Sequence, residues 1–477
     1  MHRPLDKIIR WVYKKHRGTP HSDLRREAAT MSEEERLGEI KELLREMIRN
    51  KCVNPPGNEM RSIRTLQEYF AAHGVEAQVF ESDEGRGNLY ARIEGTDPEH
   101  PSLMFGPCHV DVVPVEDPDT WTVDPWEGVE KDGFIWGRGA FDMLFIVACQ
   151  AAVFAGLAQE GFRPRGDLVF LAVCDEETGG LFGAKWMLEE HPELVKTDFA
   201  VTEAGGFPIA PSRYILTVGE KGVNWKRLTF RGEEGHGSMP YGTPNAVLKM
   251  SQAALRLSRY KPPIETGFIG ELARGLGLNR LMRLFLENRY LVPLAIKLSA
   301  RKEMGMAKAL HALTRMTISP NVARGGTKTN IIAGQATLDV DIRTLPGQDE
   351  GYVMHHLKRA LGDLAPEVEI TKPPGMPTSL GNASPSRSDF VDAMREAVRQ
   401  CTTPDAELVP MLSTGASDMR FLREVGTQAY GFSLFDDRLK LSELTALAHG
   451  DDERVSIGTL RLTAEVYERL ARDFLGP

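Results

Sequence analysis

The sequence predicts an α/β protein in which helices flank a mixed, largely parallel β-sheet, with an α+β, ferredoxin-like domain inserted into it. Two apolar runs, LMFG (103–106) and LVFLAVC (168–174), have the composition of strands that are buried on both faces. The apolar segment 145–158 between them has the length of a helix that connects two parallel strands. Further along, strand-like and helix-like segments follow the β-α-β-β-α-β order of a separate two-layer domain.

The chain before these strands predicts a basic extension and two helices. The first 20 residues contain six Lys or Arg residues and one Asp. We interpret the first 30 residues as a solvated basic extension, and the alternative is a helix that lies on a membrane surface. Ser32 and Glu35 form the S-x-x-E capping box of a helix start, and the turn NPPGNE (54–59) ends that helix. A second helix is expected to end at Gly74.

The inserted domain is predicted from alternating and helical patterns of apolar residues. We expect a strand at 225–232, a helix at 245–260, strands within 329–345, a helix at 351–361 and a strand at 367–370. An additional helical stretch, roughly 264–312, contains apolar residues that suit either a lid or a core, namely Phe268, Ile269, Leu281, Leu284, Phe285 and Leu286. The α/β pattern then resumes and closes with a helix at 456–474. The predicted catalytic domain therefore comprises 1–218 and 376–477, and the inserted domain comprises 219–375.

Composition excludes several classes of protein. The 477 residues include 58 Lys or Arg and 67 Asp or Glu, and this net charge of −9 argues against a nucleic-acid partner. Five scattered cysteines without a C-x-x-C pair indicate neither a disulfide framework nor a zinc ribbon, and they favour a reducing, cytoplasmic compartment. Because no secretory signal or run of about 18 apolar residues is seen, we expect no membrane contact.

The first chemical motif is HVDVVP (109–114), which directly follows the strand LMFG. Ligands of open α/β sheets bind beyond the carboxyl ends of the strands. His109 and Asp111 are two residues apart, so in an extended segment both point the same way and the carboxylate can select the imidazole tautomer. This arrangement is common for a metal-binding histidine, but the H-x-D pair alone more often belongs to a structural histidine.

Two further motifs place carboxylates at the same kind of position. Asp142 in GRGAFDM (137–143) precedes the buried helix, where it is either a helix cap or a ligand. Glu176 and Glu177 in DEETGG follow the strand LVFLAVC. Because these neighbours must point differently, one could bind a metal while the other transfers protons. An acidic surface turn is the alternative, but such turns rarely follow so buried a strand.

Glu203 in VTEAGG and His449 in ALAHGDDE complete the set. Singly each is ambiguous, since a lone late histidine is usually structural. Together, two histidines and three carboxylates are the ligands that two zinc ions need, with one carboxylate as a bridge between them. The combination therefore predicts a two-metal site.

These motifs, with W-x-x-x-P-W (121–126) between the first two, resemble in order the di-zinc exopeptidase and deacylase family. This family includes carboxypeptidase G, aminoacylase, acetylornithine deacetylase, succinyl-diaminopimelate desuccinylase and carboxypeptidase S. The resemblance implies that His109 and Glu203 bind one zinc, that His449 and Glu177 bind the other, that Asp142 bridges them, that Asp111 orients His109 and that Glu176 is the general base.

The resemblance also implies a lid in the inserted domain. His236 in GHGSMP resembles the lid histidine that polarises the scissile carbonyl, from a partner subunit or by domain closure. Asn330 and Arg343 resemble lid residues that hold the substrate, and the Gly415–Ser417 loop resembles a contact to the substrate backbone. Two positions depart from the common pattern: Leu144 replaces a frequent Lys, and Glu203 replaces the Asp of some members.

From this resemblance we expect a metal-dependent hydrolase that cleaves the amide bond of an N-acyl amino acid or short peptide with a free carboxylate. Its cofactors would be two Zn²⁺ ions, with Co²⁺ or Mn²⁺ as substitutes. The alternatives are a dipeptidase or carboxypeptidase with strict peptide specificity and a non-catalytic binding protein. A homodimer through the lid domain is expected, and the 264–312 stretch is a candidate dimerisation surface.

Overall fold

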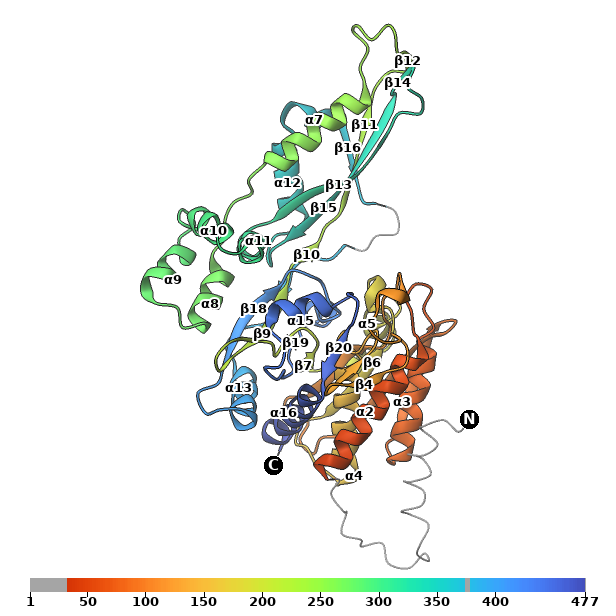
Figure 1. Ribbon diagram of the computed structural model, residues 1–477, viewed down its shortest axis with the longest axis vertical. Helices are drawn as coiled ribbons and strands as arrows, with labels where there is room; N and C mark the ends of the chain where they lie inside the picture. The colour runs from red at the N-terminus through yellow and green to blue at the C-terminus, as the bar shows by residue number, and fades with distance from the viewer. Residues whose placement is uncertain (1–31, 374–377, 477) are drawn as a thin grey trace, which may run out of the picture. The chain divides into compact units, whose positions relative to one another are not determined.

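The computed structural model describes residues 32–373 and 378–476 of the 477-residue chain. These residues form two compact units (Figure 1). The first comprises the described residues up to Val218 together with Ser384–Pro410 and those from Ser417 onward, and the second comprises Gly219–Ala383 and Met411–Ala416. The basic extension predicted for the first 30 residues lies outside the described part.

The longer segment of the second unit ends at Ala383, whereas the sequence placed the end of the inserted domain at residue 375. The physical reason is a strand pair: β17 (Asn382–Ala383) lies antiparallel to residues Glu220 and Gly219 at the start of this unit. Two residues of strand give too little pattern to be recognised in the sequence. The pairing therefore extends the second unit further along the chain than the sequence indicates.

The first unit is built on a mixed sheet, which agrees with the predicted fold class. Its strands lie in the order β1 (Ala77–Asp83), β2 (Arg86–Ile93), β6 (Leu168–Val173), β3 (Leu103–His109), β7 (Phe199–Thr202), β19 (Gln428–Gly431) and β9 (Arg213–Glu220), with β8 (Pro208–Ala210) and β18 (Glu407–Ser413) beside β9. The central strands β6, β3, β7 and β19 are parallel, and β1, β2 and β9 pair antiparallel with their neighbours. A small sheet of β4 (Val129–Lys131), β5 (Phe134–Trp136) and β20 (Arg454–Ser456) accompanies it.

Helices cover both faces of this sheet. One apolar core joins it to α2 (Glu33–Asn50), α3 (Met60–Ala72), α4 (Leu144–Gln159), α13 (Asp389–Cys401) and α16 (Ile457–Leu475). A second core joins its other face to α5 (Ala184–Glu190), α6 (Pro192–Val195) and α14 (Met419–Glu424). The predicted capping box of Ser32 and Glu35 is present at the start of α2. Among the described helices, none has the length and apolar character that a membrane crossing requires.

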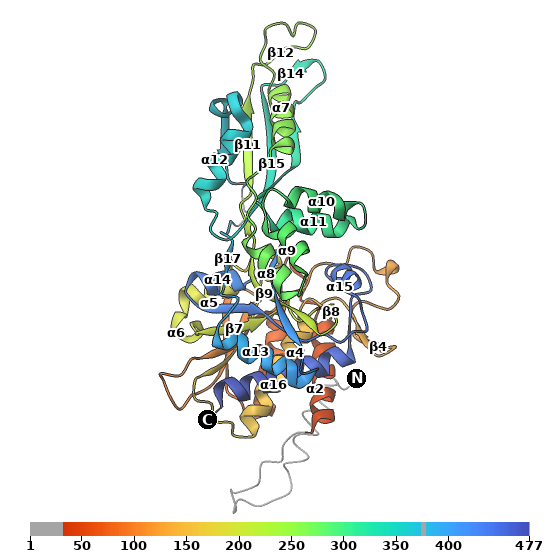
Figure 2. The ribbon, with the colours of Figure 1, turned by 90° about the vertical axis from the view of Figure 1, so that its left-hand side faces the viewer.

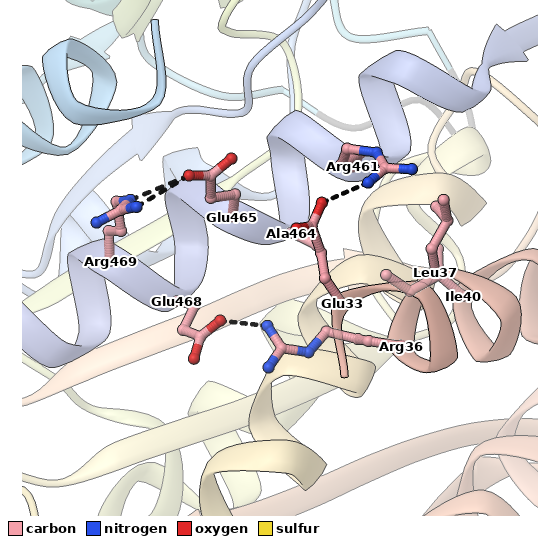
Figure 3. Close-up of a pocket in the computed structure, with 9 residues that line it drawn as sticks. All are labelled: Glu33, Arg36, Leu37, Ile40, Arg461, Ala464, Glu465, Glu468 and Arg469. Atoms are coloured by element: carbon pink, nitrogen blue, oxygen red, sulfur yellow. Dashed lines mark hydrogen bonds and ion pairs between the residues drawn. The ribbon is translucent and has the colours of Figure 1, made fainter. Parts of the chain in front are cut away.

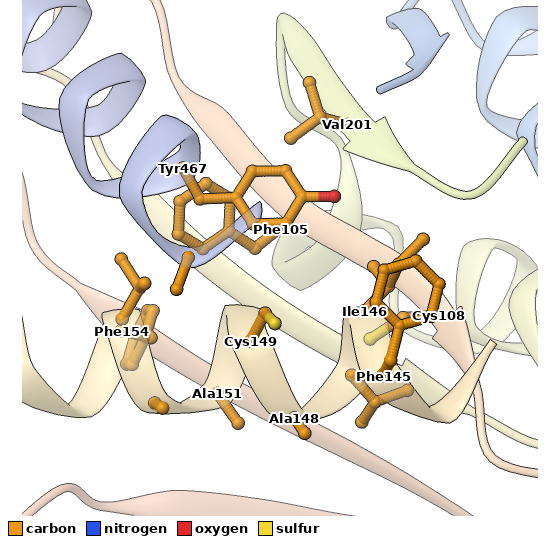
Figure 4. Packing of buried hydrophobic residues seen from close by; sticks show 14 of the residues in the cluster. Phe105, Cys108, Phe145, Ile146, Ala148, Cys149, Ala151, Phe154, Val201 and Tyr467 are labelled. Atoms are coloured by element: carbon orange, nitrogen blue, oxygen red, sulfur yellow. The ribbon is translucent and has the colours of Figure 1, made fainter. Parts of the chain in front are cut away.

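Helix α4 is the centre of the larger core (Figure 4). Every residue from Leu144 to Leu157 is buried, as the sequence indicates, and Gln150 is the polar one among them. Phe105 of β3 packs against Tyr467 of α16 with ring centroids 5.4 Å apart. Cys108 and Cys149 are buried in the same core, and all five cysteines are unpaired. This packing fixes the end of β3 and the beginning of α4, which bear two of the chemical motifs.

A cavity of about 220 Å³ lies between α2 and α16 (Figure 3). Arg36 pairs with Glu468 across it, and Arg461 pairs with Glu33 at 2.6 Å. The charges that line this cavity are thus neutralised by one another. The arrangement stabilises helix packing and offers no free group for chemistry.

The second unit is a two-layer domain in the predicted β-α-β-β-α-β order, and its helices α7 (Ala246–Arg259) and α12 (Glu350–Leu361) lie beside its sheet (Figure 1 and Figure 2). Its antiparallel sheet has the order β13 (Thr317–Gly325), β15 (Gln335–Thr344), β11 (Lys226–Arg231) and β16 (Val368–Thr371), and β10 (Gly222–Val223) also pairs with β15. Helices α7 and α12 share one core with this sheet. The sequence did not mark β13, because it is an edge strand with Pro320 in it and exposed side chains.

Four short helices follow α7 in the stretch 264–312: α8 (Gly267–Gly275), α9 (Arg280–Glu287), α10 (Val292–Ala300) and α11 (Met304–Leu313). Figures 1 and 2 both show them gathered in one cluster. Ile269, Leu310 and Leu313 are buried with Leu345 and Leu412 of the same unit. Part of this stretch is therefore core, and part of it is exposed.

Lys221 is fully buried in the second unit and makes that unit sensitive to pH. Its Nζ donates hydrogen bonds to the carbonyl oxygens of Ala312 and Arg315 at 2.8 and 2.9 Å. Burial lowers the pKa of Lys221 from 10.5 to about 7. Between these two values the folded chain binds fewer protons than the unfolded chain, so the free energy of unfolding should rise with pH, by at most about 1.4 kcal/mol per pH unit.

Replacing Lys221 by Met should raise the free energy of unfolding at pH 7 and remove this contribution to its pH dependence. Urea unfolding across the same pH range measures both effects, and the exposed Lys297→Met variant is the control. An identical pH slope in the wild type and in Lys221→Met would contradict the assignment.

Candidate metal centre

The candidate site lies in the first unit, where three neighbouring parallel strands end. His109 is the last residue of β3, and Glu203 follows β7 directly. Glu176 and Glu177 follow β6 in a 3-10 turn (Glu176–Thr178). Because the carboxyl ends of parallel strands meet at one edge of a sheet, these side chains converge there.

Asp142 lies between the two histidines. Its Oδ1 is 3.4 Å from His109 Nε2, and its Oδ2 is 3.4 Å from His449 Nε2. Each histidine also faces one glutamate: His109 Nε2 is 3.8 Å from Glu203, and His449 Nε2 is 3.1 Å from Glu177. The structure therefore brings together all five residues for which the sequence predicted metal binding.

Asp111 orients this arrangement in two ways. His109 Nδ1 lies 3.0 Å from the backbone carbonyl oxygen of Asp111 and 3.6 Å from its carboxylate. The carbonyl, which the sequence argument did not consider, is thus the hydrogen-bond acceptor that leaves Nε2 free to face the site. The Asp111 carboxylate instead accepts hydrogen bonds from the Glu176 and Glu177 backbone N–H groups and from Asn54 at 3.3, 3.1 and 2.8 Å.

The turn with Glu176 and Glu177 is held from several sides. Asp175 accepts hydrogen bonds from the Arg86 guanidinium at 2.7 Å and from the Phe182 backbone N–H at 3.0 Å. Arg420 donates to the carbonyl oxygen of Gly179 at 2.8 Å. Gly180 has φ +70°, and a Cβ there would lie 2.1 Å from Asp418 Oδ1, so the turn needs glycine at this position.

The pKa values of the site residues are shifted by burial and by the many carboxylates that lie close together there. Burial and the neighbouring Glu203 raise the pKa of Glu176 well above its ordinary value, and burial also raises the pKa of Glu177. Burial alone would lower the pKa of His109, but the Asp142 and Glu203 carboxylates outweigh it and raise that pKa. The same effect of Asp142 and Glu177 raises the pKa of His449 to about 10. The cluster therefore has an excess of buried negative charge and favours cations.

The residues fit a pair of metal ions. His109 Nε2 and Glu177 Oε1 are buried without a hydrogen-bond partner among the described residues, as expected of atoms that bind a metal. Two groups of three residues place their ligand atoms within 4.8 Å of one another: His109, Asp142 and Glu177, and His109, Glu176 and Glu203. Imidazole nitrogens and carboxylate oxygens suit zinc and related divalent metals.

Two buried acids near the site were missed by the sequence analysis. Glu453 accepts hydrogen bonds from the backbone N–H groups of Gly139, Phe141 and Asp142 at 2.8–2.9 Å and pairs with Arg138 at 2.7 Å. It ends the ALAHGDDE motif, in which only His449 was recognised. Asp418, in STGASD, is buried with neither carboxylate oxygen hydrogen-bonded to any described residue, and burial raises its pKa to about 7. Glycine-rich and acidic loops are the only sequence signals that point to them.

Replacing Glu453 by Ala should destabilise the protein by about 3–5 kcal/mol, because it leaves the Arg138 guanidinium buried without its partner. The loop that positions Asp142 should also loosen, since three of its N–H groups lose their acceptor. Urea unfolding and metal content measure the two effects. The exposed neighbour Asp451→Ala is the matched control, and equal stability of the two variants would contradict this role.

The predicted substrate-binding residues of the second unit lie on its sheet and hairpin. His236 is in β12 (Gly235–His236), which pairs with β14 (Ile331–Ile332), and its Nδ1 lies 2.7 Å from Ser238 Oγ. The Asn330 carbonyl accepts a hydrogen bond from the Gly237 N–H at 2.8 Å, which places Asn330 beside this histidine. Arg343 is in β15, where its Nε donates to Asp341 at 2.9 Å.

The remaining pair, Gly415 and Ser417, is divided between the units. Gly415 is exposed and belongs to the second unit, whereas Ser417 is buried in the first, where its Oγ accepts from the Met419 N–H at 3.3 Å. Leu144, which replaces a frequent Lys of the resembled family, is buried in the core of the first unit.

Known proteins resemble this chain over most of its length. Residues 108–473 match the model of peptidase family M20/M25/M40. The chain is 27% identical over 440 residues to a succinyl-diaminopimelate desuccinylase of Parvibaculum lavamentivorans, covering 90% of this chain and 94% of that protein. It is 26% identical over 471 residues to an N-fatty-acyl-amino acid synthase/hydrolase of Xenopus tropicalis, covering 93% and 87%.

A solved structure supports the fold independently. The crystal structure of an M20 family metallo-carboxypeptidase from Sulfolobus solfataricus superposes with a TM-score of 0.68 at 19% sequence identity. The superposition covers 93% of this chain and 99% of that chain. At this identity the likeness establishes the fold alone.

Proposed function

The chain belongs to peptidase family M20/M25/M40 and is an enzyme, and from this premise we propose that it hydrolyses the amide bond of an N-acyl amino acid or short peptide with a free carboxylate. The observation that supports this proposal most is the position of Asp142, 3.4 Å from a histidine on either side. A carboxylate between two histidines, each with its own glutamate, suits two metal ions that share one bridging ligand.

His109 and Glu203 would bind one ion, His449 and Glu177 the other, and Asp142 both. Zn²⁺ is the proposed metal, and Co²⁺ or Mn²⁺ accept the same ligands. When bound, such a pair lowers the pKa of a water molecule toward about 7 and polarises a carbonyl oxygen. Asp111 keeps the His109 tautomer that this binding requires.

Glu176 is the proposed general base. Burial and the neighbouring Glu203 raise the pKa of Glu176 well above its ordinary value, so this carboxylate binds a proton more readily than an exposed glutamate does. It would take a proton from the attacking water and give it to the leaving amine. His236 would donate a hydrogen bond to the scissile carbonyl oxygen, and Arg343 would bind the free carboxylate through its guanidinium. Asn330 and the Gly415–Ser417 loop would position the rest of the substrate.

The names of the two relatives described above favour acylated amino acids over strict peptides. Both the desuccinylase and the fatty-acyl hydrolase are named for an acyl group attached to an amino acid, and both align over at least nine-tenths of this chain. The metallo-carboxypeptidase resembles the chain in fold only. A dipeptidase or carboxypeptidase is therefore the second candidate.

This function is tested by measuring the metal content of the purified protein and its hydrolysis of a panel of substrates. The purified enzyme is stripped with a chelator, reconstituted with Zn²⁺, Co²⁺ or Mn²⁺, and assayed with N-acetyl, N-succinyl and N-dodecanoyl amino acids and with dipeptides. We expect about two metal ions per chain and metal-dependent release of the amino acid from the acylated substrates. Cleavage of dipeptides alone would favour the second candidate, and cleavage of neither class would refute the proposal.

We also propose a homodimer formed through the second unit. Its edge strand β13 is nine residues long and largely exposed, so it offers unpaired backbone groups to another chain. The hairpin beside His236 exposes Met239 at 71% and Tyr241 completely. Exposed apolar side chains beside a candidate catalytic group suit an interface at which His236 acts in the active site of the partner subunit.

We also propose a cytoplasmic location, because the five cysteines are unpaired, as is usual in a reducing compartment.

Mixing two inactive variants tests whether His236 acts on the partner subunit. His236→Ala and Glu176→Gln are each expected to be nearly inactive. If His236 acts in trans, subunit exchange should restore up to about a quarter of wild-type activity, because half of the dimers are mixed and one of their two sites is complete. Analytical ultracentrifugation verifies the dimers, and mixing each variant with itself is the control. Absence of recovery with proven exchange would contradict action in trans.

A further inference from the structure

The helical cluster α8–α11 contains an open apolar groove of about 510 Å³. Thirteen of its fifteen lining residues are apolar, and the two polar ones are Ser299 and Lys302. The side chains of Leu281, Met282 and Met306 line it while remaining 50–65% exposed. Apolar side chains gathered in this way are typical of a site that binds a protein, a membrane or an apolar ligand, whereas scattered exposed ones would need no explanation.

The groove lies in a basic part of an acidic protein. Residues 264–312 contain eight Lys or Arg and four Glu, a net charge of +4, whereas the whole chain has −9. Lys302 is the charged residue of the lining, it is exposed, and its ammonium contacts no carboxylate among the described residues. A ligand that places hydrocarbon in the groove would therefore meet an unpaired positive charge at its edge.

We propose that this groove binds the hydrocarbon chain of a long-chain fatty carboxylate, with the carboxylate beside Lys302. A volume of about 510 Å³ is within the range of roughly 300–1,000 Å³ of small-ligand sites. A peptide is less suitable, because its backbone groups would find one hydroxyl and one ammonium as partners in the groove and would lose their hydration. Binding there requires neither the metal ligands nor Glu176, so the inference goes beyond the proposed amide hydrolysis.

Binding is measured on full-length Glu176→Gln protein, so that turnover of any ligand does not enter. Displacement of dansyl-labelled undecanoate by octanoate, decanoate and dodecanoate, each below its micelle concentration, gives the dissociation constants. Each CH₂ group transferred from water into the groove should tighten binding roughly fourfold. The same titration with dodecanol, which lacks the charge, separates the contribution of the chain from that of the head group.

Two variants with matched controls locate the site. Ala295→Trp should fill the groove and weaken dodecanoate binding at least tenfold, whereas Ala309→Trp, on the exposed side of α11, should not. Lys302→Gln should weaken dodecanoate binding severalfold and leave dodecanol binding unchanged, whereas Lys297→Gln should change neither. Circular dichroism verifies folding, and the Lys302 comparison remains decisive if Ala295→Trp proves unstable.

Several results would overturn the proposal. Dissociation constants that do not depend on chain length, or that are equal in Ala295→Trp and Ala309→Trp, would exclude the groove as the binding site. Sedimentation of anionic vesicles with the protein, without binding of monomeric dodecanoate, would indicate a membrane surface instead. A wild-type dimer that Ala295→Trp converts to monomers would indicate that a second copy of the chain covers the groove.

Discussion

Replacing Glu176 by Gln is expected to lower kcat by about 10²–10⁴-fold while leaving metal content and folding intact, because a glutamine cannot accept the proton of the attacking water. Its neighbour Glu177 faces His449 at 3.1 Å and is a proposed metal ligand, whereas Glu176 is proposed to move a proton. The amide retains the size of the carboxylate, so the turn between β6 and Gly180 should keep its conformation.

Steady-state kinetics on the best substrate of the panel, with metal analysis of the same preparation, measures this effect. The exposed Glu190→Gln variant carries the same change away from the site and should behave like the wild type. Since the loss concerns proton transfer, KM should change far less than kcat. Activity within tenfold of the wild type would exclude Glu176 as the general base.

Replacing Asp142 by Ala is expected to remove both metal ions and to lower activity by at least about 10³-fold, because metal ions contribute several kcal/mol to the transition state of such reactions. Within the described part of the chain, Asp142 is the one carboxylate that lies 3.4 Å from both histidines. Its loss should therefore affect the two proposed metal positions together. Replacement of Glu177 should affect chiefly the position that it shares with His449.

Metal content and thermal unfolding with and without added Zn²⁺ measure this second effect. A metal at 100 times its dissociation constant stabilises the folded state by about 2.7 kcal/mol, so Zn²⁺ should raise the Tm of the wild type and not that of Asp142→Ala. The exposed Asp119→Ala variant is the control. Two retained ions per chain in Asp142→Ala would contradict its role as the bridge.

The fold class could be predicted because its signals are local. The capping box of Ser32 and Glu35 determines where α2 begins, and the apolar segment of α4 is interrupted between Leu144 and Ala158 by Gln150 alone. The motif that begins at His109 starts where strand β3 ends, so the sequence also indicates which end of this strand bears the candidate site. In each case the physical reason lies within a few residues of the chain.

Parts of the site could not be predicted, because their partners are distant in the sequence. Glu453 accepts hydrogen bonds from Gly139, Phe141 and Asp142, more than 300 positions away, and nothing in its own neighbourhood indicates this. Asp418 lies against Gly180 in the same way. The local sequence around each acid is typical of a solvent-exposed loop, and only the tertiary structure shows that the side chain is buried.

The sequence by itself determined the α/β architecture, the candidate residues for metal binding and the presence of a helical insertion, since periodicity and residue type are local properties. The tertiary structure decided that Asp142 faces both histidines and that the backbone of Asp111 accepts the His109 hydrogen bond. It also decided that α8–α11 leave an apolar groove uncovered. Distances, burial and unpaired charge arise only when segments far apart in the chain are packed together, and the chemistry of the site depends on all three.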